Sequence, residues 1–534
     1  MINNTIIKNV RRAAMVAALA PAIALTSCNN DVLDLEPAYS LSENSGFDTP
    51  AHVELAVAGA YDLCQQGHYS GSIARGYPFG AASILQGEMR GEDFMMSQQF
   101  YLITFQGTYN ASSLNNLTMW EASFEALNRV NIVMQGAKQA GADGVIDATT
   151  ANQYEGEMLF LRALIYHNLL IHFSAPYNLT GYNNDYGLPL YLTPNITQDD
   201  VDAAMTIGRS TVAQTYSQIL NDLNQAENLL PETNASNNIT RANKWAAIAM
   251  KTRVYLHMRD WTNVVTEAKK FDSAPYALEA DPATPFLSYT SNKESIFSIE
   301  NAADDNATVN GSMSNMFNPY NRYMCPMSPI LYNNPLWLED DKRREELVEI
   351  FATDGVPYCY KYRSEGNDND YQGEYAPMLR LAEVYLNYAE AALRNGDKDT
   401  ALTYLNKVRD RSLADPASQS YKAADFDSAT DMLNAILWEK RFETFGEGLR
   451  WGDIHRLAVD DMAPTGGIPA KIRYQNVRGA AAADVFVIGK EIDESWYLVG
   501  AYPYTDRRFL WPIPTNDLSR NATLAAQQNV GWSD

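Results

Sequence analysis

The most regular pattern in the chain is a recurrence of apolar residues three or four positions apart. Between 119 and 140 it forms a single apolar stripe, as an amphipathic helix requires, made of Trp120, Phe124, Leu127, Val130 and Met134. The stretch 152–173 is apolar around most of its circumference, which is typical of a deeply buried helix. Together the two stretches predict a pair of long helices.

The same spacing recurs further along the chain and predicts a repeated helical scaffold. Thr49 is the expected N-cap of a helix over 49–64, with Pro50 at its first position, and Ser210 is the expected N-cap of a helix over 210–230. Units of two helices joined by a short turn resemble tetratricopeptide repeats, in which each pair buries its apolar face against the next. Further helices are expected over 243–258, 261–271, 378–394, 399–411 and 431–446.

We therefore predict a mostly α fold, a tetratricopeptide-like scaffold decorated by long loops and a few short strands. Its four degenerate pairs are 119–173, 210–258, 261–271 with an unassigned partner, and 378–411 with 431–446 packed after it. The scaffold as a whole covers about 119–271 and 376–446.

Three regions interrupt the helical pattern with Gly, Asn, Ser and Tyr, namely 65–116, 272–375 and 447–534. Within them we expect short strands at 295–300 and 485–488, and a charged helical piece over 339–351. Long irregular segments on a rigid scaffold are where binding usually occurs. The first two regions are therefore the predicted ligand-binding loops, and the third is an irregular C-terminal region.

The first 27 residues have the layout of a secretory signal peptide. A basic start is followed by an almost wholly apolar run over 13–25, which is too short to span a bilayer. Leu25-Thr26-Ser27-Cys28 then resembles a bacterial lipobox, whose cysteine is acylated. The alternatives are a plain secretory signal with an incidental Cys28, or a buried apolar helix. The predicted divisions are a signal peptide at 1–27, a lipidated tether at 28–50 and a single body at 51–534.

Composition narrows the classes of partner. Removing residues 1–27 takes away three basic residues and no acidic one, which changes the formal net charge from -24 to about -27. Such a body repels phosphates, so we expect no nucleic acid, and contact with the membrane only through the lipid on Cys28. The 32 Tyr and nine Trp offer flat apolar faces with a polar edge, as sugar or peptide binding requires.

The cysteines and histidines do not predict a metal site. Without Cys28, three cysteines remain, so at most one intramolecular bridge forms, and Cys325 with Cys359 is the pair that could staple the second loop region. No CxxC motif occurs, the six histidines are scattered, and zinc is not expected. No cofactor is predicted; a structural calcium ion stays open, although EF-hand spacing is absent.

Several segments resemble the SusD/RagB-like nutrient-binding lipoproteins of the outer membrane, in the order in which that family has them. The similar segments are EGEMLFLRALIYHNLLIHF (155–173), RSTVAQTYSQILNDLNQAENLLP (209–231), RANKWAAIAMKTRVYLHMRDW (241–261), PMLRLAEVYLNYAEAAL (377–393), LNKVRDRS (405–412), LWEKRFETFGEGLRWGDIHR (437–456), FLWPIPTNDL (509–518) and QQNVGW (527–532). Lys440 stands where the family more usually has Arg, and Val530 replaces its Pro.

The charged residues of the 437–456 segment look like an active site, but ion pairing explains them equally well. Opposite charges recur three or four positions apart among Glu443, Glu447, Arg450, Asp453 and Arg456. We therefore interpret them as structural. Arg162 and Arg241 are likewise expected to clamp neighbouring segments rather than to touch a ligand.

The resemblance implies a receptor and not an enzyme. Members of the family are lipid-anchored at the cell surface, capture oligosaccharides, or peptides in some branches, and partner a SusC-like TonB-dependent outer-membrane transporter. The main alternative is a glycoside hydrolase, which would need two carboxylates about 5–10 Å apart in a cleft. Glu88, Glu92 and Asp93 are the candidates for such a pair, although acidic neighbours of this kind also arise by chance among 65 acidic residues. A pure protein-interaction scaffold is the third alternative.

Ligand contact is expected from aromatic side chains with amide or Arg partners in the two loop regions, because rings stack on pyranose faces while polar groups meet hydroxyls. From 69–109 the candidates are Arg75, Tyr77, Asp93, Phe94 and Tyr101. From 289–337 the candidates are Phe317, Tyr320, Asn321, Tyr323 and Trp337.

Replacing Cys28 by Ala removes the only predicted acylation site. We expect the Cys28→Ala protein to leave the membrane fraction of fractionated cells, because about 0.8 kcal/mol per buried CH₂ of acyl chain is lost. Protease added to intact cells should digest the wild type; protection of the wild type would show that the body does not face outward.

Overall fold

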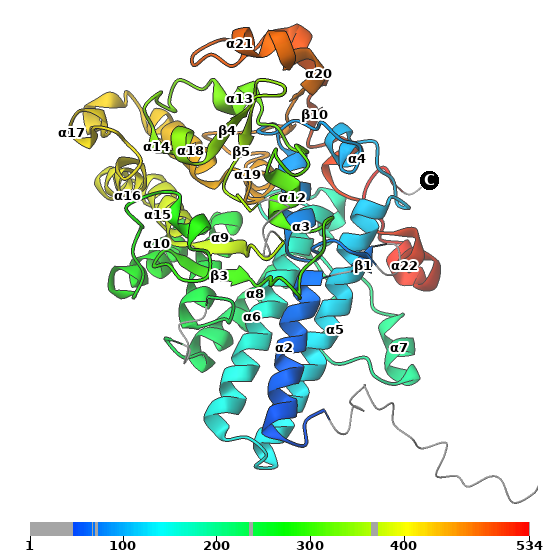
Figure 1. Cartoon of the computed structure of the whole chain (residues 1–534). Coiled ribbons are helices and arrows are strands. Elements are labelled where there is room, and N and C mark those ends of the chain that lie inside the picture. The colour runs from blue at the N-terminus through cyan, green and yellow to red at the C-terminus, as the bar shows by residue number, and fades with distance from the viewer. Residues whose placement is uncertain (1–45, 67, 70–72, 234–238, 365–371, 533–534) are drawn as a thin grey trace, which may run out of the picture.

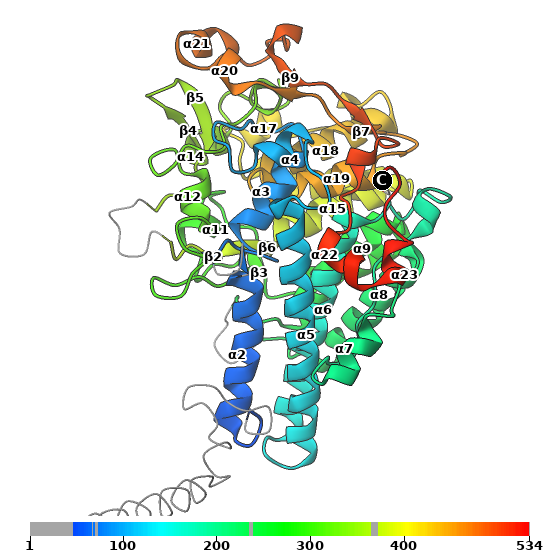
Figure 2. The same ribbon diagram turned by 90° about the vertical axis from the view of Figure 1, so that its right-hand side faces the viewer.

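Three long helices form the lower part of the molecule in this computed structural model, which describes residues 46–66, 68–69, 73–233, 239–364 and 372–532. They are α2 (Pro50–Gln66), α5 (Leu114–Ala142) and α6 (Ala148–Phe173), and they run side by side (Figures 1 and 2). The predicted helices over 49–64, 119–140 and 152–173 are confirmed. The signal peptide, Cys28 and nearly all of the tether lie outside the described residues.

The remaining scaffold helices stack one on another. They are α8 (Val212–Leu229), α9 (Lys244–Met258), α10 (Trp261–Lys269), α15 (Leu381–Arg394), α16 (Lys398–Asp410) and α18 (Ala429–Thr444). Contacts run from α5 to α6, α8, α9, α10 and α15 in turn, and α15 also packs on α16 and α18. The predicted mostly α repeat scaffold is confirmed, and α10 finds the partner that the sequence left unassigned, because it lies against both α9 and α15.

Side-chain caps explain where these helices begin. Thr211, not Ser210, caps α8, since its side chain accepts from the Gln214 N–H and the Gln214 side chain returns the bond. Ser210 instead donates to the Leu188 carbonyl at 2.8 Å. Asn243 caps α9 through the Ala246 N–H, and Asp147 caps α6.

The strands are short and pair in twos. The antiparallel pairs are β1 (His68–Tyr69) with β2 (Ile73–Ala74), β3 (Ser295–Ile299) with β6 (Ala376–Arg380), β4 (Val348–Phe351) with β5 (Val356–Cys359), β7 (Gly467–Ile468) with β10 (Tyr502–Pro503), and β8 (Lys471–Ile472) with β9 (Tyr497–Val499). The expected strand at 295–300 is confirmed as β3.

Three local predictions are wrong. The stretch 485–488 is not a strand: α21 (Ala482–Val485) ends there. Helix is restricted to α14 (Lys342–Glu346) within 339–351, because the residues that follow pair with β5 as strand β4. Met378 belongs to β6 and pairs with β3, so the helix after it begins at Leu381. At Met378 a partner distant in sequence, β3, overrides the local helical pattern, and at 348–351 the partner is the adjacent hairpin strand β5.

Short helices fill the irregular regions. They are α3 (Ala81–Arg90), α4 (Leu102–Gln106), α7 (Gln198–Ala204), α11 (Thr284–Leu287), α12 (Met313–Phe317), α13 (Pro329–Tyr332), α17 (Pro416–Gln419), α19 (Arg450–Arg456), α20 (Tyr474–Val477), α22 (Thr515–Arg520) and α23 (Ala522–Ala525). One apolar core runs through the scaffold and the loops beside it, and a smaller cluster packs 472–485 on β5. No helix among the described residues has the length and apolar character needed to cross a bilayer.

Arginines clamp the scaffold helices as predicted. Arg162 of α6 donates to both carboxylate oxygens of Asp222 in α8, at 2.8 and 2.7 Å. Arg241, before α9, binds Glu54 of α2 and Glu157 of α6. Each guanidinium therefore joins elements that are distant in sequence.

A buried ion network joins the scaffold to the loop regions. Arg380, at the end of β6, donates to Glu294 before β3, to Glu443 in α18 and to Glu447, at 2.5 to 3.0 Å. Glu443 also binds Arg343 of α14 and Arg411 after α16, and Glu447 binds Lys361 after β5. Burial raises the pKa of the Glu443 carboxyl, but Arg411, Arg380 and Arg343 outweigh it and hold that pKa below its usual range.

The network confirms a structural role for the charged segment but corrects how its residues pair. Glu443 and Glu447 bind partners on other elements, and Arg450 binds Glu92 at 2.6 Å. Arg456 with Asp453, at 2.7 Å, is a pair within one helix, three positions apart. Sequence spacing suggested local pairs throughout, whereas burial requires these charges to find partners across the fold.

The Glu443→Gln variant should unfold far more easily than the wild type. It keeps the shape of the side chain and removes the charge that three guanidiniums share, so we expect a loss of about 3–5 kcal/mol in the free energy of unfolding, measured in urea. The control is Glu155→Gln, which breaks the surface pair with Lys138 and should cost less than about 1 kcal/mol. Equal losses in the two variants would contradict the role given to the network.

Candidate functional site

Backbone pairing brings the two predicted loop regions together. The Met95 N–H donates to the Pro326 carbonyl at 2.8 Å, and the Ser97 N–H donates to the Met324 carbonyl at 3.1 Å. On the other side of this segment, the Met327 N–H donates to the Pro357 carbonyl of β5 at 2.8 Å. Residues 94–97, 324–327 and β5 therefore lie next to one another, and the loops that precede and follow them share one surface.

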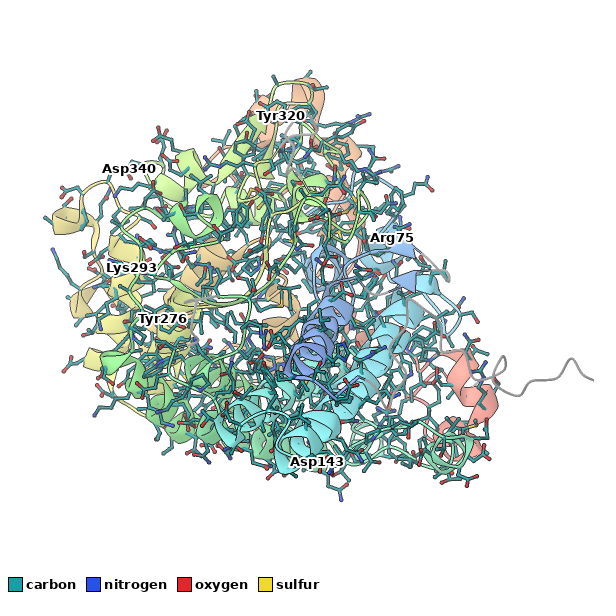
Figure 3. All side chains as sticks on the ribbon, turned by 60° about the horizontal axis from the view of Figure 1, so that its bottom comes forward. Arg75, Asp143, Tyr276, Lys293, Tyr320 and Asp340 are labelled. Atoms are coloured by element: carbon teal, nitrogen blue, oxygen red, sulfur yellow. The ribbon has the colours of Figure 1, made fainter. Side chains whose placement is uncertain are left out.

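The most conspicuous feature of this surface is a group of aromatic rings, which we call the aromatic platform: Tyr320, Tyr323, Phe351 and Tyr360. Tyr320 and Tyr323 are 50% and 43% exposed. The Tyr320 ring meets Phe351 edge-on at 5.5 Å, and the Tyr323 ring stacks on Phe351 at 6.0 Å with an interplanar angle of 21°. Tyr320 lies at one extremity of the molecule, away from Asp143 in the turn between α5 and α6 (Figure 3).

Polar groups border the platform. The Tyr320 hydroxyl donates to Glu349 at 2.5 Å, and the Asn321 amide donates to the Ser364 carbonyl at 2.8 Å. The Arg363 guanidinium lies 5.1 Å from the centre of the Tyr360 ring. Exposed rings with amide and charged neighbours can stack on an apolar ligand face and hydrogen-bond its edge.

A second aromatic group adjoins the platform, and we call it the Phe100 clamp: Arg75, Phe100 and Arg322. Phe100 is 45% exposed. The Arg75 and Arg322 guanidiniums lie 5.2 and 5.8 Å from the centre of its ring, within the range of cation–π contact. Arg322 also donates to the Asn310 side chain at 2.7 Å. Because Arg322 stands between Asn321 and Tyr323 in sequence, the clamp and the platform are continuous.

The structure divides the ten predicted ligand residues. Tyr320, Asn321 and Tyr323 lie at the platform, and Arg75 reaches the surface through the Phe100 clamp, being 9% exposed itself. Six are reassigned from the ligand surface to the core, because their side chains are at most 2% exposed: Tyr77, Asp93, Phe94, Tyr101, Phe317 and Trp337.

Five of the six residues reassigned to the core have a clear structural partner there. Phe94 meets Phe317 edge-on at 6.0 Å, and Trp337 stacks on Phe442 of α18 at 5.3 Å. Asp93 forms an ion pair with Arg441 of the same helix. The Tyr77 hydroxyl accepts from Gln86 at 2.8 Å.

Sequence reasoning missed Phe100, Phe351, Tyr360 and Arg322. The local pattern predicts a helical piece that ends at Phe351, whereas strand pairing brings both Phe351 and Tyr360 next to Tyr320. Arg322 could have been predicted from the sequence, because it lies between Asn321 and Tyr323, which are both predicted ligand residues. Phe100 is adjacent to Tyr101 in sequence, but the Phe100 side chain is exposed and the Tyr101 side chain is buried.

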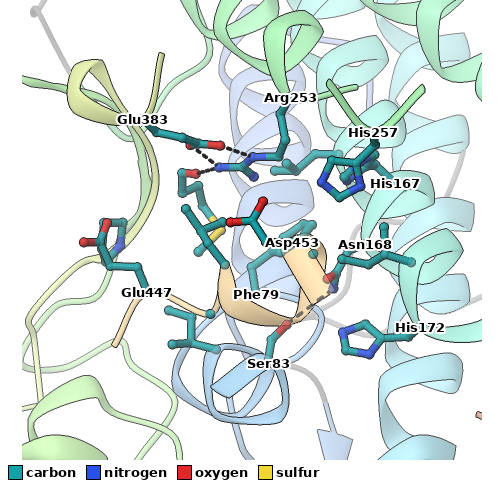
Figure 4. A pocket seen from close by; sticks show the side chains of 18 of the residues that line it. Phe79, Ser83, His167, Asn168, His172, Arg253, His257, Glu383, Glu447 and Asp453 are labelled. Carbon is teal, nitrogen blue, oxygen red and sulfur yellow. Dashed lines mark hydrogen bonds and ion pairs between the residues drawn. The ribbon is translucent and has the colours of Figure 1, made fainter. Parts of the chain in front are cut away.

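A separate polar pocket of about 70 Å³ lies inside the scaffold between α3, α6, α9 and α19 (Figure 4). The rings of His167 and His257 are 4.8 Å apart in its wall, and Arg253 binds Glu383 beside them. Burial lowers the pKa of His167 to about 3, so this imidazole is neutral near pH 7. The space is large enough to hold ordered water among these polar side chains.

The Cys325–Cys359 bridge that the sequence leaves possible is not formed in this structure, in which both are free buried thiols. The two cysteines flank the bridge pair Pro326–Tyr358 on facing antiparallel segments, so the pairing stays a hypothesis. No group of three or more His, Cys, Asp or Glu within the described ranges is arranged to hold a metal.

Taken together, a rigid helical-repeat scaffold carrying an exposed aromatic surface defines a binding protein. Comparison with known proteins then gives its family. The "SusD family" model matches residues 334–532, and the model described as "Starch-binding associating with outer membrane" matches residues 31–256. The chain belongs to the SusD/RagB family.

Individual relatives agree with this assignment. A SusD-like protein of Formosa agariphila is 20% identical over 81% of this chain and 87% of its own length, and one of Bacteroides ovatus is 22% identical over 83% and 82%. A SusD superfamily structure from Bacteroides fragilis superposes with a TM-score of 0.72 at 24% identity, covering 90% of this chain and 99% of the other. A surface glycan-binding protein A from Bacteroides uniformis gives 0.67 at 20% identity, with coverage of 90% and 99%.

Glu88 of α3 is a buried carboxyl near Cys325 and Cys359. One of its oxygens accepts from the Gly448 N–H at 2.7 Å, while the other has no hydrogen-bond partner. Burial, and then the charge of Asp93, raises its pKa to about 8. The folded protein therefore keeps this carboxyl protonated at neutral pH.

This raised pKa predicts that Glu88→Gln becomes relatively more stable as pH rises. Between pH 4.5 and about 8 the unfolded chain releases the Glu88 proton and the folded protein retains it, so the wild type loses stability across this window. The glutamine variant has no proton to lose. We expect the difference in Tm, variant minus wild type, to increase by roughly 1–3 °C between pH 5 and pH 8.5; parallel melting curves would contradict the raised pKa.

Proposed function

We propose that this protein is a cell-surface glycan-binding lipoprotein that captures oligosaccharides and delivers them to a TonB-dependent outer-membrane transporter. The observation that carries the proposal is the aromatic platform. Tyr320 and Tyr323 are exposed although both contact Phe351, and exposed paired rings offer a ligand a ready apolar surface. Pyranose rings have apolar faces that stack on such rings, while their hydroxyls bond to the amide and carboxylate groups at the border.

The comparisons support a glycan ligand. One matching family model is described as starch-binding, and one of the structural neighbours is a surface glycan-binding protein. These descriptions belong to the relatives; for this chain the platform supplies the matching chemistry. A peptide ligand, bound as in the RagB branch, is the alternative within the same fold.

The burial of the candidate acids supports binding without catalysis. A hydrolase places its two carboxylates in a cleft that the substrate can enter. Here Glu88, Glu92 and Asp93 are at most 6% exposed. Glu92 is bound to Arg450 and Asp93 to Arg441, so these acids serve the fold.

The arrangement of the molecule suits a tethered receptor. The described chain enters at the lower end of α2, while β4 and β5, which carry part of the platform, lie at the opposite end (Figures 1 and 2). A lipid on Cys28 would hold the first end near the membrane. The platform would then lie at the end of the molecule far from the anchor, where it is accessible to ligands.

Removing the platform tyrosines should weaken ligand binding. We expect the double variant Tyr320→Ala/Tyr323→Ala to lose at least tenfold in affinity for the oligosaccharide that the wild type selects from a panel, in calorimetry or affinity electrophoresis, because stacked rings contribute roughly 1 kcal/mol each.

The control is Tyr497→Ala, which removes a tyrosine of β9 that is 37% exposed and outside the platform. Binding of peptides alone would replace the glycan proposal with the peptide alternative. Release of reducing ends from a polysaccharide would support the hydrolase, and unchanged affinity in the double variant would place the site elsewhere.

A further inference from the structure

The charge distribution around the platform differs from that of the chain as a whole. The formal net charge is -24, yet three guanidiniums, those of Arg75, Arg322 and Arg363, border the platform and the Phe100 clamp. Two carboxylates in the same place are already engaged, Glu349 by the Tyr320 hydroxyl and Glu346 by Arg363. Among the described residues, the guanidiniums at the platform and the clamp therefore outnumber these carboxylates by three to two.

Arg322 is the cation that this neighbourhood leaves least compensated. Its contacts are an amide oxygen of Asn310 and the ring of Phe100, both of which are neutral. Over the part of the chain that the structure describes, no carboxylate lies within 4.0 Å of its nitrogens, although pairs of that kind are common elsewhere in the fold. A guanidinium has five donors, so Arg322 retains the capacity to bind an anion.

The Phe100 clamp also holds two like charges against one ring. The Arg75 and Arg322 guanidiniums lie 5.2 and 5.8 Å from the centre of the Phe100 ring, so two positive charges border the same exposed side chain. An anionic group that binds Arg322 beside this ring would be attracted by both charges. Guanidiniums bind carboxylates and sulfated groups through paired, charge-assisted hydrogen bonds, which are stronger than those between neutral groups.

We propose that the ligand of this surface is an acidic glycan, a saccharide that carries a carboxylate or a sulfate ester. Its sugar ring stacks on Tyr320 and Tyr323, and its anionic group binds Arg322 beside Arg75. This inference rests on the proposed function and names its ligand class. Carboxylate and sulfate present the same anionic oxygens to a guanidinium, and the experiment separates them.

The test compares ligands that differ only in charge. Calorimetry measures wild-type binding of oligogalacturonate against its uncharged methyl ester, and of a sulfated neutral galactan oligosaccharide, which has no carboxylate, against its desulfated form. We expect the charged member of at least one pair to bind roughly tenfold more tightly in 50 mM salt. That advantage should shrink as salt is raised, because added ions screen the charges. The pair that shows the advantage identifies the anionic group.

The Arg322→Gln variant assigns the effect to its residue. Glutamine keeps an amide donor for Asn310 and removes the charge, so we expect the roughly tenfold preference to disappear while affinity for the uncharged member is unchanged. Arg322→Lys, which keeps the charge, should retain part of the preference. The matched control is Arg520→Gln, at an exposed arginine of α22, which should change neither affinity.

The outcomes separate this inference from the proposed function. Equal binding of charged and uncharged members, with Tyr320 and Tyr323 still required, overturns the acidic ligand and leaves a glycan receptor. An equal loss for both members in Arg322→Gln shows that Arg322 only supports the loop, and also overturns it. If no glycan binds and acidic peptides do, both the inference and the proposed function fail.

Discussion

The rest of the structure depends on the need to compensate buried charge around Arg380. This guanidinium, with Arg343, Arg411 and Lys361, shares the carboxylates of Glu294, Glu443 and Glu447 in the interior. An ion removed from water is costly unless its partners are in place, so none of the contributing elements can shift alone. Those elements include α18 of the scaffold and β6, but also α14 and the chain after β5 in the loop regions. The network therefore fixes long irregular segments to a repeat scaffold that would otherwise only support them from one side.

A fixed loop region has a direct consequence for binding. The strand β5 pairs with β4, which ends at Phe351, and Phe351 is the ring on which Tyr320 and Tyr323 rest. Tyr323 has a backbone φ of 39°, a left-handed conformation that costs free energy in a residue other than glycine and persists only where its surroundings impose it. Because the rings are already placed, a ligand loses little affinity to ordering the surface it meets.

The same constraint explains what the sequence could and could not reveal. The helical scaffold was predictable, since the spacing of Trp120, Phe124 and Leu127 records burial against a neighbour one helix away. The exposure of loop aromatics was not: Trp337 is buried because Phe442 and Phe445 of a distant segment cover it. Tyr320, a loop aromatic of similar local sequence character, is left half exposed. The spacing of charges within 437–456 was equally ambiguous, because local pairing and pairing across the fold require the same residue types.

Net charge was informative about the whole body and uninformative about the site. A formal charge of -24 argues against nucleic acid as a partner, yet electrostatic interactions between exposed groups are screened over about 8 Å at physiological ionic strength. A ligand at the platform consequently meets the potential of its immediate neighbours, the guanidiniums of Arg75, Arg322 and Arg363 and the carboxylates of Glu346 and Glu349, and little of the acidic surface beyond. The net charge of the chain disfavours association with large polyanions such as nucleic acid. The binding of a small charged group depends instead on the few side chains that contact it. The net charge of the chain is negative whereas the guanidiniums beside the platform are positive, so composition alone gives no indication of the ligand class proposed for this surface.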